Sequence, residues 1–150
     1  DGIPDTDDNN PKTATTTTVS VDDATVTEGK GIKPIPVTVK TDDKNATVDV
    51  TDLPDGLTYD ETTGEITGTP AKITDWDTTE ETRPVTVTVT VTETDGTVVT
   101  DTAVITIQRD TDGDGEPDVT DTDDDGDGIP DTEDNNPKTA TTTTVSVDDA

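Results

Sequence analysis

The chain of 150 residues contains no cysteine, histidine, methionine or phenylalanine, and it has one tryptophan and one tyrosine. Without cysteine there are no disulfides, no thiolate nucleophile and no zinc site built on sulfur. Without histidine the commonest general base and the usual transition-metal ligand are missing. The sequence therefore excludes most familiar catalytic arrangements, and we expect that the protein is not an enzyme.

Basic residues are also scarce, because nine Lys and Arg stand against 37 Asp and Glu, and the formal net charge is -28. Nucleic acid is an unsuitable partner, since binding a phosphate backbone requires positive charge. An anionic membrane surface is disfavoured for the same reason. The sequence has no signal peptide and no apolar run of membrane-spanning length, so we expect no membrane insertion and an internal fragment of a longer chain. Cations are the partners that such a surface attracts.

Only 24% of the residues are hydrophobic, but about a quarter are Thr, and many of these alternate with Val. Alternation of β-branched residues is typical of half-buried strands, and no segment has helical periodicity. Strands are predicted at residues 15–21, 24–27, 35–40, 46–50, 84–92 and 98–107. About seven short strands in all predict an antiparallel β-sandwich over residues 12–109. Trp76 and Tyr59 are the large side chains expected in its core.

Residues 53–70 read LPDGLTYDETTGEITGTP. Pro54, Asp55 and Gly56 are turn residues, as are Thr63 and Gly64, and they flank two short strands. The stretch resembles the LPxGLxxDxxTGxIxGTP signature of Ig-like, cadherin-like domains in bacterial surface proteins. This resemblance implies an Ig-like, all-β fold and an architectural motif, and it implies no catalysis.

Two acidic loops follow, each of the form D-x-D-x-D-G-x-P-D-x-x-D, and they begin 13 residues apart at Asp110 and Asp123. Calcium prefers six to eight oxygen ligands at about 2.3–2.6 Å, and alternate residues of a curled loop can point toward one ion. Glycine at the sixth position permits a sharp turn, and the carbonyl group of the seventh can add a ligand. We therefore expect about two calcium ions. The predicted ligands are Asp110, Asp112, Asp114, Glu116, Asp118 and Asp121 in the first loop, and Asp123, Asp125, Asp127, Ile129, Asp131 and Asp134 in the second.

These loops are not an EF-hand pair, because the last position is Asp rather than Glu and no amphipathic helix flanks them. They are similar to thrombospondin type 3 repeats, whose short aspartate-rich loops wrap calcium ions in series. The resemblance covers residues 110–134 and implies calcium binding, although the disulfide cysteines of the vertebrate family are absent. A solvated acidic linker is the alternative interpretation, and magnesium is the weaker candidate ion because it keeps its own water ligands.

The first 24 residues recur as residues 127–150 with one difference, Asp7 against Glu133. Such near-identity indicates a tandem array with a unit of 126 residues, the offset between Asp1 and its counterpart Asp127. The predicted organisation is the end of a preceding calcium-binding linker at 1–11, the sandwich at 12–109, the calcium-binding segment at 110–137, and the first strand of the next repeat at 138–150.

Residues 110–134 hold thirteen Asp and Glu and no Lys or Arg, so without metal they repel one another. We expect a calcium-binding stalk repeat of a cell-surface adhesin or biofilm-associated protein, extracellular and anchored to a bacterial cell wall. Calcium would stiffen the joints between neighbouring repeats, which are its partners within the chain. The alternative is a calcium-dependent adhesive module that binds another copy or a host ligand directly.

Overall fold

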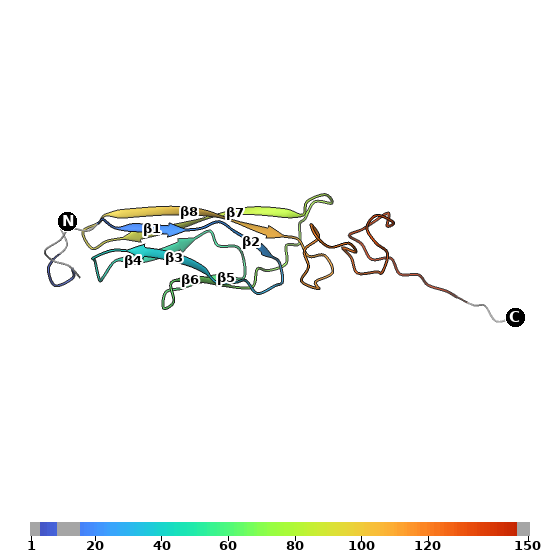
Figure 1. The fold of residues 1–150 in the computed structure, drawn as a ribbon, viewed down its shortest axis with the longest axis horizontal. Coiled ribbons are helices and arrows are strands. Elements are labelled where there is room, and N and C mark those ends of the chain that lie inside the picture. The colour runs from blue at the N-terminus through green and yellow to red at the C-terminus, as the bar shows by residue number, and fades with distance from the viewer. Residues whose placement is uncertain (1–3, 9–15, 147–150) are drawn as a thin grey trace.

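A computed structural model describes residues 4–8 and 16–146, and these contain eight β-strands and no helix. The molecule is elongated, with residues 4–8 at one end of the β-domain and the acidic segment 110–134 at the other (Figure 1). The strands are β1 (Thr18–Val21), β2 (Ala24–Thr27), β3 (Ile35–Lys40), β4 (Thr47–Thr51), β5 (Leu57–Asp60), β6 (Glu65–Gly68), β7 (Thr82–Thr92) and β8 (Val98–Gln108).

The strands form two four-stranded sheets, in the orders β1-β3-β6-β5 and β2-β8-β7-β4. The chain crosses from the first sheet to the second at Asp22 and Asp23, between β1 and β2. β1 pairs with β3 in antiparallel fashion, whereas β2 runs parallel to β8. The predicted all-β sandwich is confirmed, with this one parallel pair among otherwise antiparallel neighbours.

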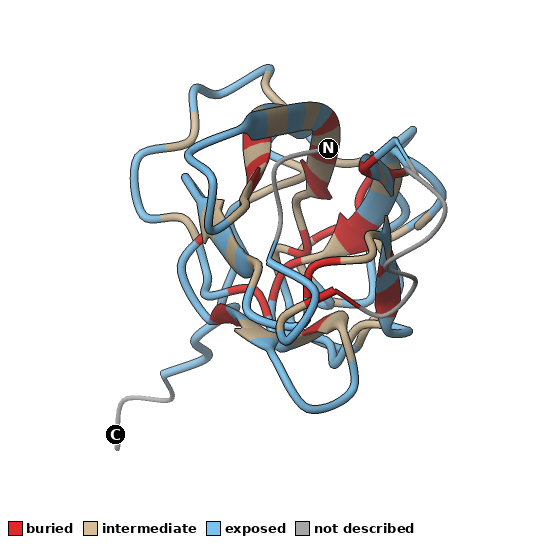
Figure 2. Cartoon of the chain, turned by 90° about the vertical axis from the view of Figure 1, so that its left-hand side faces the viewer, coloured by how far each residue is buried: buried red, intermediate tan, exposed pale blue. Residues whose placement is uncertain are grey.

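The core lies between the two sheets, where buried segments gather in the interior of the domain (Figure 2). β7 and β8 are the longest strands that contribute to it. Each of these strands has 11 residues and the same alternation of exposed and buried positions. Val87, Val89 and Val91 are completely buried, while the threonines between them face the other way. Burying such a side chain stabilises the fold by about 1.5–3 kcal/mol, so this alternation suffices to select the inner face of the strand.

The strand bounds differ from the prediction mainly at their ends. β7 begins at Thr82, two residues before the expected start, and β4 runs from Thr47 to Thr51. β1 begins at Thr18, and Thr15, its expected start, lies outside the described residues. Residues 53–70 form the two short strands expected there, as a hairpin of β5 and β6.

The prediction that Trp76 fills the core was wrong, whereas Tyr59 does pack against the core residues. Trp76 lies in the connection between β6 and β7 and is partly exposed. Its indole nitrogen donates to both carboxylate oxygens of Glu28, at 3.2 and 3.1 Å. A buried indole N–H needs an acceptor, and the aliphatic core between the sheets has none to offer.

Two glycines explain the signature at residues 53–70. A Cβ atom at Gly56 would lie 2.0 Å from the carbonyl oxygen of Thr69, and one at Gly68 would lie 2.3 Å from that of Gly56. Both residues have positive φ, at 88° and 125°. The backbones before β5 and after β6 therefore approach one another more closely than any side chain would allow.

We predict that Gly56→Ala destabilises the β-domain more than Gly96→Ala does. Both glycines have φ near 89°, but a Cβ atom at Gly96 would meet nothing within 4 Å. The control therefore bears only the strain of a positive φ, about 1–2 kcal/mol, whereas Gly56→Ala adds a backbone clash. Urea unfolding measures both losses, and equal losses would show that the close approach has no energetic role.

Candidate calcium-binding site

The first acidic loop is folded by its own carboxylates. Asp110 accepts hydrogen bonds from the backbone N–H groups of Gly113, at 2.8 Å, and Gly115, at 3.1 Å. Asp112 accepts from the N–H of Asp114 at 2.9 Å, and Asp114 from that of Glu116 at 2.7 Å. Local bonds of this kind curl the backbone. The loop thus gathers its first three acids on one side.

The second loop repeats this network 13 residues further along, except that the N–H of Gly126 donates to the backbone carbonyl oxygen of Asp123, at 3.0 Å, and not to its carboxylate. Asp123 accepts from the N–H of Gly128 at 3.0 Å. Asp125 accepts from the N–H of Asp127 at 3.2 Å, and Asp127 from that of Ile129 at 2.9 Å. The spacing seen in the sequence is therefore also the period of the structure.

Each loop brings three carboxylates together. Asp110, Asp112 and Asp114 offer oxygens within 4.8 Å of one another, as do Asp123, Asp125 and Asp127. In the second loop, Oδ1 of Asp123, Oδ2 of Asp125 and Oδ2 of Asp134 are buried with no hydrogen-bond partner among the described residues.

A buried carboxylate oxygen without a donor is costly unless a cation lies beside it. The residues of the second loop therefore fit a hard, oxygen-binding cation such as calcium. The first loop has a similar backbone network and an equivalent three-carboxylate cluster, although Asp112 and Asp114 are exposed.

The acids at the ninth loop position, Asp118 and Asp131, accept hydrogen bonds from the second position of their own loops. Asp118 accepts from the backbone N–H of Thr111 at 2.8 Å and from its hydroxyl group at 2.7 Å. Asp131 likewise accepts from the N–H of Asp124 at 2.9 Å. Both residues close their loop onto its second position and lie outside the two three-carboxylate clusters.

The last position of the first loop, Asp121, accepts from the backbone N–H groups of Thr122 and Asp123, at 2.6 and 3.0 Å. It therefore forms the turn between the two loops. The ligand roles of all twelve predicted residues stay predictions, those of the carbonyl groups of Glu116 and Ile129 included.

Lys138 was missed by the sequence analysis. Its Nζ atom lies 2.6 Å from Oδ2 of Asp124, 2.8 Å from Oδ2 of Asp118 and 3.4 Å from Oε1 of Glu81. Burial opposes the charge of Lys138, but its hydrogen bonds to the two aspartates outweigh burial and raise its pKa. The one available signal was its isolation, since Lys138 is the only basic residue after Arg109.

The two aspartates paired with Lys138 have pKa values shifted in opposite directions. Burial opposes ionisation of Asp118, yet the hydrogen bonds from Lys138 and Thr111 prevail, so the pKa of Asp118 is lowered. Burial raises the pKa of Asp124, against the hydrogen bond from Lys138. Lys138 thus joins both loops to Glu81, next to the start of β7. We call this set of ion pairs from Lys138, which follows the acidic segment, the strap.

Glu28 attaches the first loop to the β-domain. Its carboxylate is 2% exposed and accepts from the backbone N–H groups of Asp110, at 3.2 Å, and Ile73, at 2.7 Å. Lys72 donates to the carbonyl oxygen of Asp110 at 3.0 Å, and Lys30 to that of Gly115 at 2.8 Å. The first loop is therefore built onto the end of the sandwich, next to Trp76.

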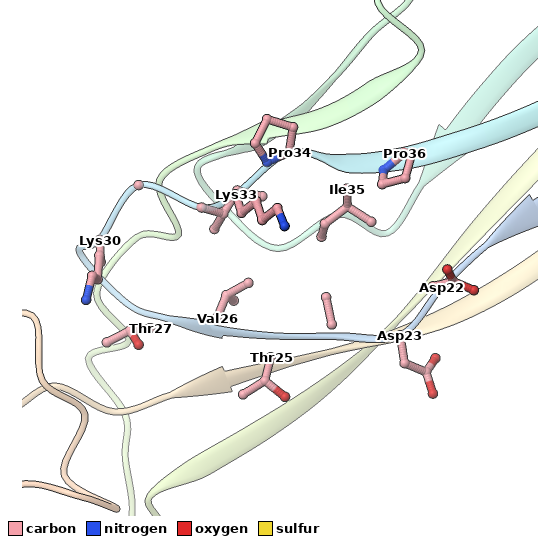
Figure 3. Close-up of a pocket in the computed structure, with 13 residues that line it drawn as sticks. Asp22, Asp23, Thr25, Val26, Thr27, Lys30, Lys33, Pro34, Ile35 and Pro36 are labelled. Carbon is pink, nitrogen blue, oxygen red and sulfur yellow. The ribbon is translucent and has the colours of Figure 1, made fainter.

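A separate groove lies between β2 and the segment that leads into β3 (Figure 3). Val26 and Ile35 face one another across it, and both belong to the core. The groove is thus the open edge of the sandwich where the chain changes sheets, and its lining does not indicate a ligand.

Two family models match the chain. The family described as "Putative Ig domain" matches residues 13–109, more than half of the chain, and the chain belongs to that family. The thrombospondin type 3 repeat model matches residues 109–144, so this Ig-like domain carries such a repeat at its C-terminal side. No curated protein matches the chain. Within the described residues, no helix is long and apolar enough to cross a membrane.

One solved structure supports the fold, and two others have lower similarity. A mutant of the SrpA adhesin from Streptococcus sanguinis has 15% identity and a TM-score of 0.50, covering 67% of this chain and 62% of that chain. The BIgI domain of beta protein from S. agalactiae, bound to CEACAM1, has 23% identity and a TM-score of 0.41, with 63% and 98% covered. A SusE-like surface located polysaccharide-binding protein from Bacteroides thetaiotaomicron has 19% and 0.39, with 62% and 15% covered. The chain thus spans less than two thirds of the adhesin that it matches.

We predict that Lys138→Gln loosens the strap and red-shifts the fluorescence of Trp76. The only tryptophan lines one cavity with residues 135–139, so loss of the ion pairs to Asp118 and Asp124 should admit water beside its ring. Lys33→Gln is the control, because Lys33 is exposed and lies at the groove beside β3. Identical emission spectra in calcium-free buffer would mean that Lys138 does not hold the strap.

Proposed function

We propose that this chain is a calcium-binding structural repeat in the stalk of an extracellular bacterial surface adhesin or biofilm-associated protein. In this proposal residues 12–109 are the rigid spacer and residues 110–137 the joint, while 1–11 and 138–150 belong to neighbouring repeats. One observation carries the proposal: Asp123, Asp125 and Asp134 each have a buried carboxylate oxygen that accepts no hydrogen bond from the described residues. All three residues lie in the segment that matches the thrombospondin type 3 repeat model.

When calcium binds, it supplies positive charge and coordinates six to eight oxygen ligands. The chain itself holds alternate carboxylates on the inside of each loop and ties the first loop to Glu28. Two ions would offset four of the thirteen negative charges in residues 110–134 and remove much of their repulsion. A mobile joint would thereby become a stiff one.

The distribution of exposed apolar residues favours a spacer over an adhesive surface. Among the described residues, the large exposed ones are Val98, Val119, Ile129 and Val145. They come from the β7–β8 hairpin, the two acidic loops and the segment after them, so no single element presents several of them together as a binding surface. The sandwich of the SrpA adhesin is a precedent for this fold in a bacterial surface protein.

Calorimetric titration tests the calcium site directly. We expect saturable binding of about two ions, with dissociation constants of about 10⁻⁴–10⁻³ M as in other extracellular modules. Replacing Asp112, Asp114, Asp125 and Asp127 together by Ala should abolish it, because each three-carboxylate cluster then keeps one member.

The matched control replaces Asp22, Asp49, Asp55 and Asp77 by Ala. These residues are exposed and lie on the β-domain, so the net charge changes equally while both loops stay intact. Binding that weakens as much in the control as in the loop variant would indicate a diffuse attraction to negative charge. Absence of binding at millimolar calcium would reduce residues 110–134 to a solvated linker.

The stiffening is tested on a two-repeat chain, in which residues 1–126 precede the full chain. We expect small-angle scattering to give a narrower distribution of distances between the two β-domains with calcium than with chelator, since bound loops restrict the joint. The four-fold loop variant should show the broad distribution under both conditions. Equal dimensions of the unmodified chain with calcium and with chelator would contradict a calcium-stiffened joint.

A further inference from the structure

The end of the β-domain that lies away from the acidic segment holds a short peptide of the same chain (Figure 1). The backbone N–H of Lys44 donates to the carbonyl oxygen of Asp7 at 2.8 Å, and its Nζ atom donates to that of Thr6 at 3.3 Å. Asp8 and Asp43 form an antiparallel bridge, and they are 4% and 3% exposed. Residues 4–8 are therefore docked on the loop 41–46.

The surface that receives this peptide is fixed by the β-domain itself. One carboxylate oxygen of Asp43 accepts from the N–H of Asn45 at 2.9 Å, and the other accepts from the N–H and hydroxyl of Thr94 at 2.6 and 2.9 Å. The backbone bond from Thr94 above all lowers the pKa of Asp43 and keeps it ionised. The loop 41–46 is thus tied to the β7–β8 hairpin and presents the Lys44 amide in a set position.

The docked peptide is a copy of the end of the second acidic loop. Residues 4–8 read PDTDD, and residues 130–134 read PDTED. The two turns have the same closing bond, from the N–H of Asp8 to the carbonyl oxygen of Pro4 and from that of Asp134 to Pro130, each at 3.0 Å. A single turn can therefore close an acidic loop and lie on a β-domain without changing its conformation.

We propose that the loop 41–46 of each β-domain is the docking surface for the last turn of the acidic segment in the preceding repeat. Docking and calcium binding then use the same turn in the same conformation, with the closing bond at the Asp8 and Asp134 positions. Each therefore favours the other, and by the same free energy. This coupling rests on the proposed calcium function, whereas the docking contact does not.

Coupling is measured in the two-repeat chain with Lys44→Glu in the second copy. Lys44 is exposed, and the variant loses the bond to Thr6 and places a negative charge against the acidic turn. We expect the calcium affinity of the joint to fall about fivefold, the lower end of typical coupling between two sites. Lys33→Glu in the same copy is the matched control, with an equal change in charge and no polar contact among the described residues.

The 150-residue chain supplies a second reference. There Lys44 lies at the far end of the β-domain from residues 110–134, so Lys44→Glu should leave their calcium affinity unchanged. Equal affinities of the Lys44→Glu and Lys33→Glu two-repeat chains would overturn the coupling. A loss in the 150-residue chain as large as in the two-repeat chain would also overturn it, because the effect would then be one of overall charge.

The contact is tested separately by hydrogen exchange in the 150-residue chain with chelator present. The Lys44 amide donates to Asp7, so we expect slow exchange that becomes fast when residues 1–8 are removed. Fast exchange in the intact chain would overturn the docking surface. Slow exchange in a chain that binds no calcium would support the docking surface and overturn the calcium function and the coupling.

Discussion

The burial of carboxylates is the constraint on which the rest of this structure depends. Six of the seven buried polar residues in the described part of the chain are acids: Asp8, Glu28, Asp43, Asp110, Asp118 and Asp124. A buried carboxylate costs free energy unless hydrogen bonds or opposite charges compensate. With nine basic residues against 37 acids, most of that compensation has to come from backbone N–H groups. The chain is accordingly rich in turns that aim successive amides at one acid.

This constraint separates the β-domain into a middle and two ends. Between the sheets the side chains are aliphatic, and Val87, Val89 and Ile66 are fully buried with no polar neighbour required. The buried acids lie at the ends, with Glu28 beneath the first acidic loop and Asp43 beneath the docked residues 4–8. A carboxylate at an end of the domain can accept hydrogen bonds from the backbone N–H groups of a second segment and so fix its orientation. An aliphatic side chain accepts no hydrogen bonds and cannot do this. The two segments that dock on the ends of the domain, residues 4–8 and the first acidic loop, therefore lie where its buried acids are.

The local patterns were sufficient to predict the strands and the loops. Alternation of Val and Thr located β7 and β8 because a period of two fixes which face is buried. The 13-residue spacing located both three-carboxylate clusters, since each loop is curled by bonds between residues two to five positions apart.

The contacts that sequence reasoning missed join distant segments. Lys138 reaches Asp118 and Asp124 across 20 and 14 residues, and Glu28 reaches Asp110 across 82. Trp76 was assigned to the core because its size suggested it, but its indole N–H requires the acceptor that Glu28 provides. A periodic sequence pattern cannot predict these contacts, because they depend on where the segments outside the strands lie once the sandwich has formed.

The internal repeat makes these distant contacts informative about an array. In a proposed array each acidic segment is held at its start by Glu28 of its own β-domain and at its end by the loop 41–46 of the next. Both anchors consist of hydrogen bonds within the protein, so neither requires a metal ion. The part left for calcium to order is the region between them, above all the second loop, where the oxygens of Asp123, Asp125 and Asp134 lack donors. A weakly bound ion would then suffice to stiffen the joint, because the anchors have already reduced the conformational freedom that binding must remove.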